Sequence, residues 1–491
     1  MTLLCLATQA QKHEVRAVWL TTIGGIDWPY AKTAAAQKQE MIRILDQLKR
    51  VNINTVLIQT RVRASTIYPS SIEPFDMCLT GTHGSNPGYD PLKFIVDECH
   101  KRGMECHAWM VTIPVGKTNE PRFKEFKRKN PKLAKSIGLE GFMNPENPAT
   151  GDYIANICAE VTRQYDIDGI HLDYIRYPET WKIKVPRQKA RDNITDIVRK
   201  IHRAVKSLKP WVKLSCSPIG KYGDLSRYKS GGWNAYNAGC QDAQGWIREG
   251  LMDQLYPMMY FRGNNFYPFA LDWQERSYGR TIVSGLGIYF LSPSEGNWTL
   301  DDVSREMYFV RQNGVGHCYF RSKFLTDNTR GIFDFVQHFD NAPALIPPMT
   351  WAWSKAPSSP TRLNIQRGSS HDRLSWSGAT DHSRAPYLLY NIYASVTPDV
   401  DVNEPRNLIA TRLYATGLNV PHTSGQTLYY AVCALDRYGN ESAPIYTAAP
   451  SGAIATGSFA AARTLSPKST RIPPFYYTWS KKKQKRYNRT H

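Results

Sequence analysis

Eight apolar, strand-like runs alternate with amphipathic stretches up to about residue 335, and this repetition constrains the fold more than any other feature. The runs cover residues 15–21, 55–61, 105–112, 169–174, 212–217, 254–260, 281–289 and 316–320. Amphipathic stretches between them include residues 37–51, 91–102, 151–165, 188–208 and 300–312. Eight strand–helix repeats predict an α/β fold of the (β/α)8 barrel (TIM barrel) type. An open doubly wound sheet is the main competitor, but residues 21–27 do not fit its Gly-rich phosphate loop.

A second pattern follows a Pro-, Ser- and Thr-rich break at residues 343–362. Alternating apolar runs at residues 373–376, 387–395, 408–413 and 428–436 are separated by turn residues, which predicts a small all-β sandwich. Residues 357–360, the Trp376 that follows on the second strand, Tyr390-Asn-Ile-Tyr-Ala394 and the run at residues 429–442 together resemble a fibronectin type III module, with Trp376 expected in the core. The predicted organisation is a signal remnant (1–12), the barrel (13–342), a linker (343–362), the sandwich (363–450) and a basic tail (451–491).

Charge is spread unevenly along the 491 residues, whose formal net charge is +20. Residues 463–491 contain nine Lys or Arg and no acid. Such a run is usually a solvated chain end, and its few aromatic residues do not form the interleaved surface of a nucleic-acid binder. We therefore expect no nucleic-acid partner, although attraction to an acidic polymer such as a cell-wall glycan stays open.

The first eleven residues and the cysteines bear on where the protein works. The apolar start, with small residues at Thr8 and Ala10, is typical of the end of a secretory signal, with an ordinary apolar terminus as the alternative. Nine scattered Cys without a C-x-x-C pair suggest neither a zinc site nor a disulfide scaffold. Four of them, Cys106, Cys216, Cys318 and Cys433, are expected in the core. The signal-like start predicts a secreted or periplasmic protein. No later run approaches a membrane span, so we expect no integral membrane segment.

Polar and aromatic residues gather at the carboxyl ends of the predicted strands, where barrel enzymes carry their chemistry. The second strand ends in Gln59-Thr-Arg61-Val-Arg63, and the third carries His107-Ala-Trp109. The fourth reads Asp168-Gly-Ile-His171-Leu-Asp173-Tyr-Ile-Arg176-Tyr-Pro178, the fifth ends in Ser215-Cys-Ser217-Pro218, and the sixth contains Tyr256 and Tyr260.

In this order, several segments resemble the bacterial glycosyl-hydrolase-like 10 family over residues 13–340. The segments are Val15-Arg-Ala-Val-Trp-Leu, Tyr68-Pro-Ser, Pro87-Gly-Tyr-Asp-Pro-Leu, His100-Lys-Arg-Gly, His107-Ala-Trp and the strand-four motif. The resemblance implies a secreted barrel glycosidase that acts on a cell-envelope glycan, such as the amino-sugar strands of peptidoglycan. One departure is Ser65, which stands where the family commonly has an acidic residue.

Strand four also echoes the D-G-x-D-x-D-x-E motif of family 18 chitinases, but Ile175 replaces its catalytic Glu. Alternation along a strand places His171 and Asp173 on one face, near the barrel mouth. Asp173 is therefore the predicted catalytic residue, as general acid/base or nucleophile. A second carboxylate is not evident among the acids of the mouth loops, which are Asp27, Glu73, Glu146, Asp224 and Glu295. A substrate N-acetyl group could replace that carboxylate as the nucleophile.

Roles for the remaining residues stay open between binding and packing. Arg61, His107, His171 and Arg176 are expected to bind the substrate or to set the pKa of Asp173. Trp109, Tyr256 and Tyr260 are expected to stack on sugar rings. His107 and Trp109 could instead belong to the core, and Arg176 could simply pair with Asp173. Asp168 is interpreted as a turn or cap residue, and Asp253 is excluded because it begins a strand.

The function predicted for this chain is therefore hydrolysis of O-glycosyl bonds in a polysaccharide, without a cofactor or a metal. Convergence of His107, His171 and Asp173 on a metal is a minority alternative. A non-catalytic glycan-binding protein that retains the barrel is the main rival, supported by Ser65 and Ile175. A protein that binds nucleic acid through its basic tail is the third hypothesis. The oligomeric state, the linkage and the stereochemical course are open.

Overall fold

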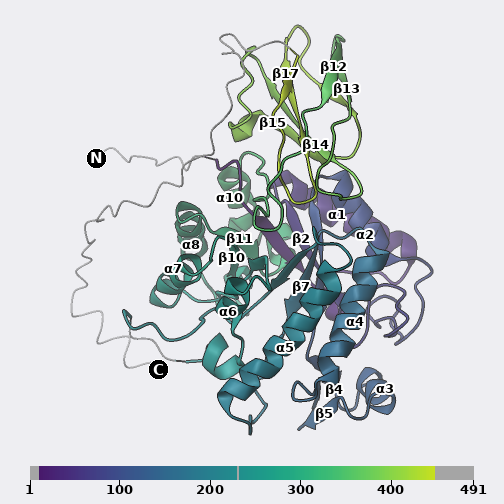
Figure 1. Ribbon diagram of the computed structural model, residues 1–491, viewed down its shortest axis with the longest axis vertical. Helices are drawn as coiled ribbons and strands as arrows, with labels where there is room; N and C mark the ends of the chain where they lie inside the picture. The colour runs from purple at the N-terminus through teal and green to yellow at the C-terminus, as the bar shows by residue number, and fades with distance from the viewer. Residues whose placement is uncertain (1–9, 229–231, 448–491) are drawn as a thin grey trace. The chain divides into compact units, whose positions relative to one another are not determined.

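The computed structural model describes residues 10–228 and 232–447, and its main feature is a closed barrel of eight parallel strands (Figure 1). Around the barrel the strand order is β1-β11-β10-β9-β8-β7-β3-β2. The bounds are β1 Arg16–Leu20, β2 Thr55–Arg61, β3 Glu105–Val111, β7 Gly169–Asp173, β8 Lys213–Cys216, β9 Gln254–Leu255, β10 Thr281–Leu286 and β11 Gly316–Tyr319. The predicted (β/α)8 barrel is confirmed. The predictions for the signal remnant up to residue 9 and for the basic tail lie outside the described residues.

Helices follow the strands and cover the outside of the barrel (Figure 1). They are α1 Ala34–Arg50, α2 Pro91–Lys101, α4 Ala149–Gln164, α5 Arg187–Lys206, α6 Ala243–Arg248, α7 Tyr267–Glu275, α8 Leu300–Gln312, α9 Ser322–Thr326 and α10 Ile332–Phe339. Local chemistry sets several starts: Asp90 accepts a hydrogen bond from the Lys93 N–H at the start of α2, and Thr299 forms a capping box with Asp302 before α8. No helix of the described residues is long and apolar enough to cross a membrane.

The sixth barrel strand is much shorter than its sequence predicts. Residues 254–260 were expected to form one strand, but β9 contains only Gln254–Leu255. Pro257 has no N–H to donate to a ladder, and beyond it Met258 makes only isolated bridges to Ile219 and Gly285. The backbone therefore leaves regular pairing before the mouth, and Tyr260 lies on a loop.

The barrel interior is a packed core of side chains from alternate strand positions. One buried cluster contains Val15, Ala17, Trp19, Leu57, Trp109, Val111, Tyr256, Val283 and Cys318. The opposite faces of the strands pack against the helices in a larger cluster that includes Cys106 and Cys216. All eight described cysteines are buried free thiols, which confirms the core positions predicted for Cys106, Cys216, Cys318 and Cys433.

A small subdomain interrupts the barrel between β3 and α4, and we call residues 114–143 the α3 excursion. It consists of β4 (Pro114–Lys117), α3 (Pro121–Lys129), β5 (Ala134–Ile137) and β6 (Glu140–Met143), and its three strands form one antiparallel sheet. Because it leaves the barrel after the carboxyl end of β3, it belongs to the face where barrel enzymes carry their sites.

Two antiparallel sheets form the C-terminal part of the described chain. One contains β12 (Thr361–Gln366), β13 (His371–Ser377) and β16 (Gly417–Pro421), and the other contains β14 (Leu389–Ser395), β15 (Leu408–Leu413), β17 (Tyr429–Leu435) and β18 (Ile445–Tyr446). Leu374 and Trp376 from the first sheet pack with Ile392 and Val432 from the second. Trp376 is thus in the core as predicted, whereas the fibronectin type III likeness and the domain limits stay predictions.

Candidate active site

Asp173 is the last residue of β7 and lies buried at the carboxyl end of the barrel, 8% exposed. Three neutral donors hold its carboxylate. The Ser217 hydroxyl and the Tyr174 N–H donate to Oδ1 at 2.9 and 2.8 Å, respectively, and the Trp109 indole N–H donates to Oδ2 at 3.2 Å. The donors come from β3, β7 and the end of β8, so the closed barrel itself orients this carboxylate.

Burial raises the pKa of the Asp173 carboxyl above its ordinary value of 3.8. The nearby Arg176 charge and the hydrogen bonds from Ser217, Tyr174 and Trp109 oppose the rise without cancelling it. A carboxyl that retains its proton to higher pH is suited to donate it in an acid-catalysed step.

Below Asp173, His171 forms part of the packed interior. Its Nε2 accepts a hydrogen bond from the Trp19 indole at 3.1 Å, and its Nδ1 lies 2.9 Å from the Ser215 hydroxyl. Burial, with His107 nearby, holds the pKa of His171 well below its ordinary 6.5. The ring is therefore neutral, with the proton on Nδ1, and both nitrogens are occupied. Substrate binding by His171 stays a prediction that these partners do not favour.

His107 and Tyr256 lie deeper still. His107 is fully buried with its Nε2 2.9 Å from Glu105 Oε2, and Gly169 makes room for its ring: a Cβ at Gly169 would stand 2.5 Å from His107 Nδ1. Tyr256 is also fully buried, packs edge-on against Trp19 and donates its hydroxyl to Gln254 at 3.1 Å. These positions favour the packing alternative for both residues over direct contact with a sugar.

Arg61 at the end of β2 is buried and has no exposed surface. Its Nε and Nη2 donate hydrogen bonds to the Glu73 carboxylate, and its Nη1 donates to the carbonyl oxygens of Val111 and Thr112. Glu73 in turn accepts a hydrogen bond from the Tyr153 hydroxyl at 3.1 Å. The guanidinium and Glu73 satisfy each other, which does not favour the predicted binding role of Arg61 or a catalytic role for Glu73.

Arg176 follows β7 and lies close to the catalytic candidate without a direct hydrogen bond to it. Its Nη1 donates to Glu179 at 2.6 Å, and its guanidinium carbon lies 4.2 Å from the centre of the Tyr174 ring. Its buried Nε has no hydrogen-bond partner within the described residues. Arg176 therefore acts on Asp173 through its charge and not through a hydrogen bond, and substrate contact by Arg176 stays a prediction.

Aromatic rings gather at the mouth around Tyr260. Its half-buried ring lies 5.6 Å from that of Tyr289 and 5.4 Å from that of Phe320, centre to centre. Phe290 and Trp298 extend the group by stacking on each other. Trp109, 4% exposed, holds Asp173 and packs in the interior. Of the predicted stacking residues, Tyr260 is thus the one whose position suits a sugar face.

The other mouth acids differ in how they are held. Asp27 is buried after β1, where it is paired with Arg321 and accepts the Thr21 N–H at 2.9 Å. Burial raises its pKa, although Arg321 opposes the shift. Glu146, Asp224 and Glu295 are exposed. Asp27 is therefore a buried acid of this face that, unlike Asp173, is paired directly with an arginine.

Ser65, which stands where an acid was expected, is buried against a carboxylate supplied from elsewhere. Its hydroxyl donates to Asp76 at 2.6 Å, and Arg122 of the α3 excursion donates to the same oxygen at 3.0 Å. Asp76, eleven residues along the chain, thus places a carboxylate beside Ser65 and fixes Arg122 beside the mouth.

Two cavities at the mouth share Arg63 in their walls. One of about 360 Å³ is lined by Ile23, Gly24, Lys32, Arg63, Met77, Cys78, Gly81, Glu120 and Arg122. The other, of about 80 Å³, is lined by Arg63, Tyr174, Pro178, Glu179, Thr180 and residues of the α3 excursion. The larger cavity is within the size range of small-ligand sites. The half-buried Arg63 guanidinium has no hydrogen bond or ion pair within residues 10–228 and 232–447.

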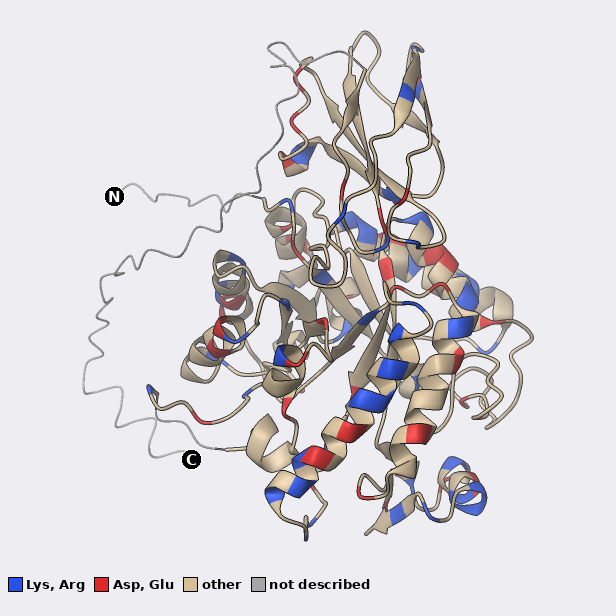
Figure 2. Cartoon of the chain, viewed as in Figure 1, with Lys and Arg blue, Asp and Glu red and all other residues tan. Residues whose placement is uncertain are grey.

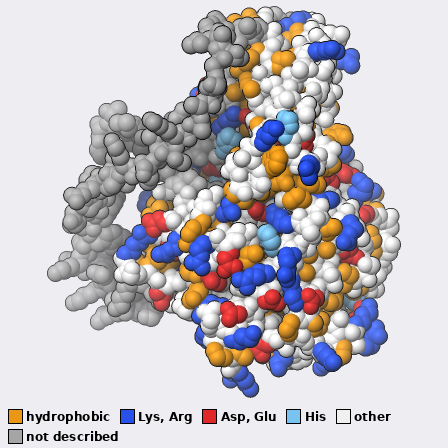
Figure 3. Space-filling view, in the orientation of Figure 1, with side chains coloured by type: hydrophobic (Ala, Val, Ile, Leu, Met, Phe, Trp, Pro, Cys, Tyr) orange, Lys and Arg blue, Asp and Glu red, His pale blue; other side chains and the backbone are white. Residues whose placement is uncertain are grey.

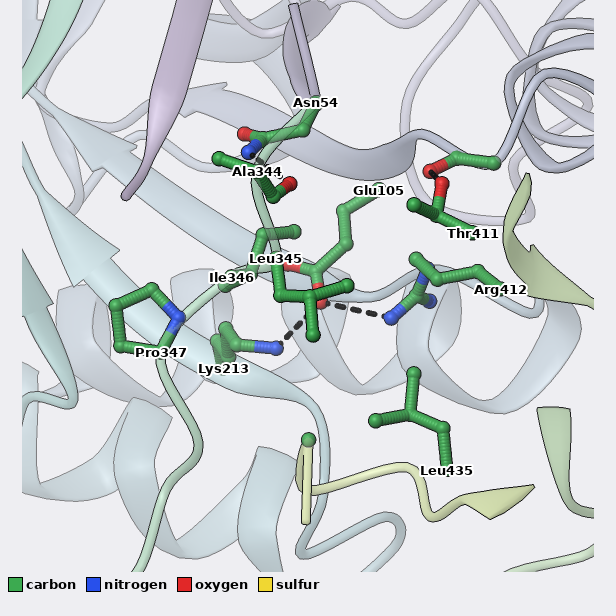
Figure 4. Close-up of a pocket in the computed structure, with 12 residues that line it drawn as sticks. Asn54, Glu105, Lys213, Ala344, Leu345, Ile346, Pro347, Thr411, Arg412 and Leu435 are labelled. Carbon is green, nitrogen blue, oxygen red and sulfur yellow. Dashed lines mark hydrogen bonds and ion pairs between the residues drawn. The ribbon is translucent and has the colours of Figure 1, made fainter. Parts of the chain in front are cut away.

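The opposite end of the barrel is closed by charges that satisfy one another. Glu105 accepts from Lys213 at 2.6 Å and from Arg412 of β15 at 3.1 Å (Figure 4). Asp168, read as a turn residue, accepts from Arg412, from Arg437 at 3.2 Å and from His100 at 2.8 Å. The cavity beside Glu105 measures about 20 Å³, room for a water molecule but not a sugar. Asp253, which accepts from Lys206 at 2.6 Å, belongs to this end as predicted.

In the described part of the chain, no three His, Cys, Asp or Glu side chains are grouped so that they could hold a metal ion. Both ring nitrogens of His171 are already engaged. The arrangement around Asp173 is that of an acid oriented by neutral donors.

Sequence reasoning did not single out Trp19, Ser217 or Arg63, although each stood within a quoted strand end or motif. Ser217 follows Ser215 by two positions on one strand, so alternation places both hydroxyls on the barrel interior. Arg63 also follows Arg61 by two positions, but it lies beyond the end of β2. Which member of each pair is buried and which reaches the mouth depends on loop paths that the sequence pattern does not encode.

Comparisons with known proteins agree with the motifs. The model of the family described as glycosyl hydrolase-like 10 matches residues 14–284. Glycosyl hydrolase YngK of Bacillus subtilis (strain 168) is 29% identical over 483 residues, 89% of this chain and 93% of that protein. Glycosyl hydrolase DigH of Escherichia coli (strain K12) is 31% identical over 294 residues, 52% of this chain and 67% of that protein.

Among solved structures, two similar chains are carbohydrate-active enzymes. The glycoside hydrolase domain of PgaB (BpsB) from Bordetella bronchiseptica aligns with a TM-score of 0.47 at 11% identity, over 67% of this chain and 99% of that one. The catalytic domain of β-amylase from Paenibacillus polymyxa aligns with a TM-score of 0.45 at 12% identity, over 68% and 99%.

Proposed function

Because the chain belongs to the glycosyl hydrolase-like 10 family, we propose that it is a secreted hydrolase of a cell-envelope polysaccharide, namely the amino-sugar strands of peptidoglycan. The observation that carries the proposal is Asp173, a buried carboxyl at the carboxyl end of β7 that three neutral donors orient. The two bacterial relatives described above also bear the name glycosyl hydrolase.

In the proposed reaction Asp173 is the general acid. Its proton passes to the glycosidic oxygen while the bond from that oxygen to the anomeric carbon breaks. The raised pKa supports this role, because the carboxyl keeps its proton at a higher pH than an exposed Asp does. Tyr260 would stack on a sugar ring, and the free Nε of Arg176 would donate to a sugar oxygen.

The nucleophile is proposed to be the acetamido carbonyl oxygen of the sugar itself. It bonds to the anomeric carbon as the leaving group departs, and water then attacks that carbon, breaks the new bond and returns a proton to Asp173. This route needs only one catalytic carboxyl group from the enzyme. It therefore agrees with the pairing of the other buried acid, Asp27, with Arg321.

The test is product release from purified peptidoglycan glycan strands, with and without stem peptides, by wild type and Asp173→Asn. Asp224→Asn is the matched control, since Asp224 is an exposed acid on the same face. We expect fragments from wild type and Asp224→Asn but not from Asp173→Asn, with reducing ends that identify the cleaved bond. Tight binding without fragments from any of the three proteins would instead support a glycan-binding protein, and equal cleavage by all three would exclude Asp173 as the acid.

A further inference from the structure

The α3 excursion concentrates positive charge to a degree that is unusual for this chain. Its 30 residues contain eight Lys or Arg and three Glu, a net charge of +5. The 432 residues outside the excursion and residues 463–491 carry 45 basic and 39 acidic residues, a net charge of +6. Figure 2 shows basic positions along α3 and its neighbouring strands, whereas Figure 3 shows both signs interspersed over much of the visible face.

Most of these charges are free to meet a ligand. Six exposed side chains of the excursion form no hydrogen bond or ion pair within the described chain, namely Lys117, Lys124, Lys127, Arg128, Lys132 and Lys135. Helix polarity accounts for the basic residues of the last turn of α3, which include Lys127 and Arg128. It does not account for Lys117 on β4, Lys124 in the first half of the helix, Lys132 beyond it or Lys135 on β5.

The excursion also walls the candidate site. Gly116, Glu140 and Phe142 line the smaller mouth cavity together with Tyr174, the neighbour of Asp173. Arg122, fixed by its ion pair to Asp76, lines the larger one. Arg63, without a partner, belongs to both cavities. The excursion therefore combines exposed, unpartnered cations with residues that wall both cavities beside the catalytic candidate, where Arg63 is also unpartnered.

We propose that the α3 excursion is a binding rim for an acidic polysaccharide, which it guides toward the barrel mouth, with Arg63 receiving a carboxylate at the inner end. The spacing of several weak, exposed cations suits a long polyanion, because each contributes little alone and their sum attracts a repeating charge. The inference deepens the proposed function in naming a charged glycan as the ligand, but binding at the rim does not require cleavage.

The test measures equilibrium binding in an Asp173→Asn background, so that no ligand is consumed. The rim variant is Lys124→Gln/Lys132→Gln/Lys135→Gln, which spares the basic last turn of α3. The control is Arg203→Gln/Lys355→Gln/Arg373→Gln, which removes three other exposed charges that have no partner within the described residues. The ligands are purified peptidoglycan glycan strands and the same strands after amidation of their carboxylates.

We expect the rim variant to bind native strands roughly tenfold more weakly at low salt, and the difference to vanish at high salt, where exposed charges are screened. Amidated strands should bind equally to the rim variant and to the parent, and the control triple should match the parent. Equal binding of native strands by the rim variant, or equal weakening by the control, would overturn the proposal.

Duplex DNA and vesicles of anionic lipid serve as competing polyanions. If either binds more tightly than the glycan and shows the same dependence on the three lysines, the assignment to a polysaccharide fails. Rim-dependent binding without fragments from the otherwise wild-type chain would remove the proposed hydrolysis and leave this inference standing. If wild type cleaves the strands and the rim variant retains both full cleavage and unchanged binding, the proposed hydrolysis stands and this inference fails.

Arg63→Gln tests the inner end separately. We expect it to weaken binding of native strands and to leave binding of amidated strands unchanged, as a carboxylate contact requires. Equal losses on both ligands would mean that Arg63 shapes the cavity and does not bind the acidic group.

Discussion

The two ends of the barrel treat buried charge in opposite ways. At the amino ends of the strands, Glu105 and Asp168 are surrounded by cations, and burial, which alone would raise their pKa values, is outweighed. At the carboxyl ends, Asp173 is held by three neutral donors, and burial prevails and raises its pKa. A carboxylate ringed by cations is committed to staying ionised, whereas one held by neutral donors can exchange a proton.

Arg61 and Glu73 show that position alone does not decide the role of a charge. They lie at the carboxyl end of β2, yet their ion pair at 2.7 Å is as complete as those at the other end. Whether a buried carboxylate is paired with a cation therefore distinguishes structural from catalytic carboxylates better than its position in the barrel does. Replacing a carboxylate by an amide should reduce stability where the carboxylate is paired with cations, and should reduce activity where it is held by neutral donors.

Asp173→Asn should cause the largest change in activity with little change in stability. We expect turnover of glycan strands to fall by about 1,000-fold, the size typical of a lost general acid. The free energy of unfolding at pH 7 should stay within about 1 kcal/mol of wild type, because removing a buried charge offsets a weakened hydrogen-bond acceptor. Steady-state kinetics and urea unfolding measure the two quantities. A large loss of stability would place Asp173 with the structural charges.

Glu105→Gln should cause a large loss of stability with little change in activity. It leaves the buried Lys213 and the neighbouring Arg412 without their shared carboxylate, and breaking such a pair costs about 3–5 kcal/mol of unfolding free energy. Lys93→Gln, which breaks an exposed pair on α2, should cost less than about 0.5 kcal/mol. Urea unfolding compares the variants. Equal costs would show that the charges at the amino ends are not effectively buried, and activity of the folded Glu105 variant should match wild type.

The charges at the amino ends of the strands should also determine how much stability the protein loses at acidic pH. Lys213 and Arg412 outweigh burial and lower the pKa of Glu105 from 4.5 to about 2. The stability that this group contributes is present above pH 4.5 and is lost as the pH falls toward 2, by roughly 3 kcal/mol over the full interval. Urea unfolding between pH 5 and pH 3 should give a flatter profile for Glu105→Gln than for wild type. Parallel profiles would mean that other carboxylates, such as Asp168, carry the whole effect.

Much of the barrel was predictable because its strands are short, apolar and regularly spaced. Residues 55–61 and 300–312 were predicted with the bounds of β2 and α8. The α3 excursion was missed because its three strands have four residues each and border a strongly charged helix, so no apolar period stands out. The strand expected over residues 254–260 failed at Pro257 for want of an N–H.

The position of Asp173 was predictable, whereas its surroundings were not. Alternation along the strand placed Asp173 and His171 on the interior face near the mouth, where the structure has both, and the catalytic role of Asp173 stays a proposal. Whether Arg61, Tyr256 or His107 faces a ligand or a partner depends on side chains from distant segments, such as Glu73 for Arg61. Likewise, Arg412 reaches Glu105 across 307 residues, a contact that no local pattern announces.

The smallest predicted effect separates two serines of one strand region. The Ser217 hydroxyl donates to Asp173 and stabilises its ionised form, whereas Ser215 contacts His171. Ser217→Ala should therefore raise the pKa of Asp173 further and move the alkaline limb of the pH–rate profile to higher pH, with a change in maximal rate of about tenfold or less. Ser215→Ala should leave that limb in place, because its hydroxyl does not touch the acid. Profiles of turnover against pH for both variants test this, and a limb that moves equally in both would mean that packing of the barrel interior, and not the hydrogen bond to Asp173, sets the proton affinity of the acid.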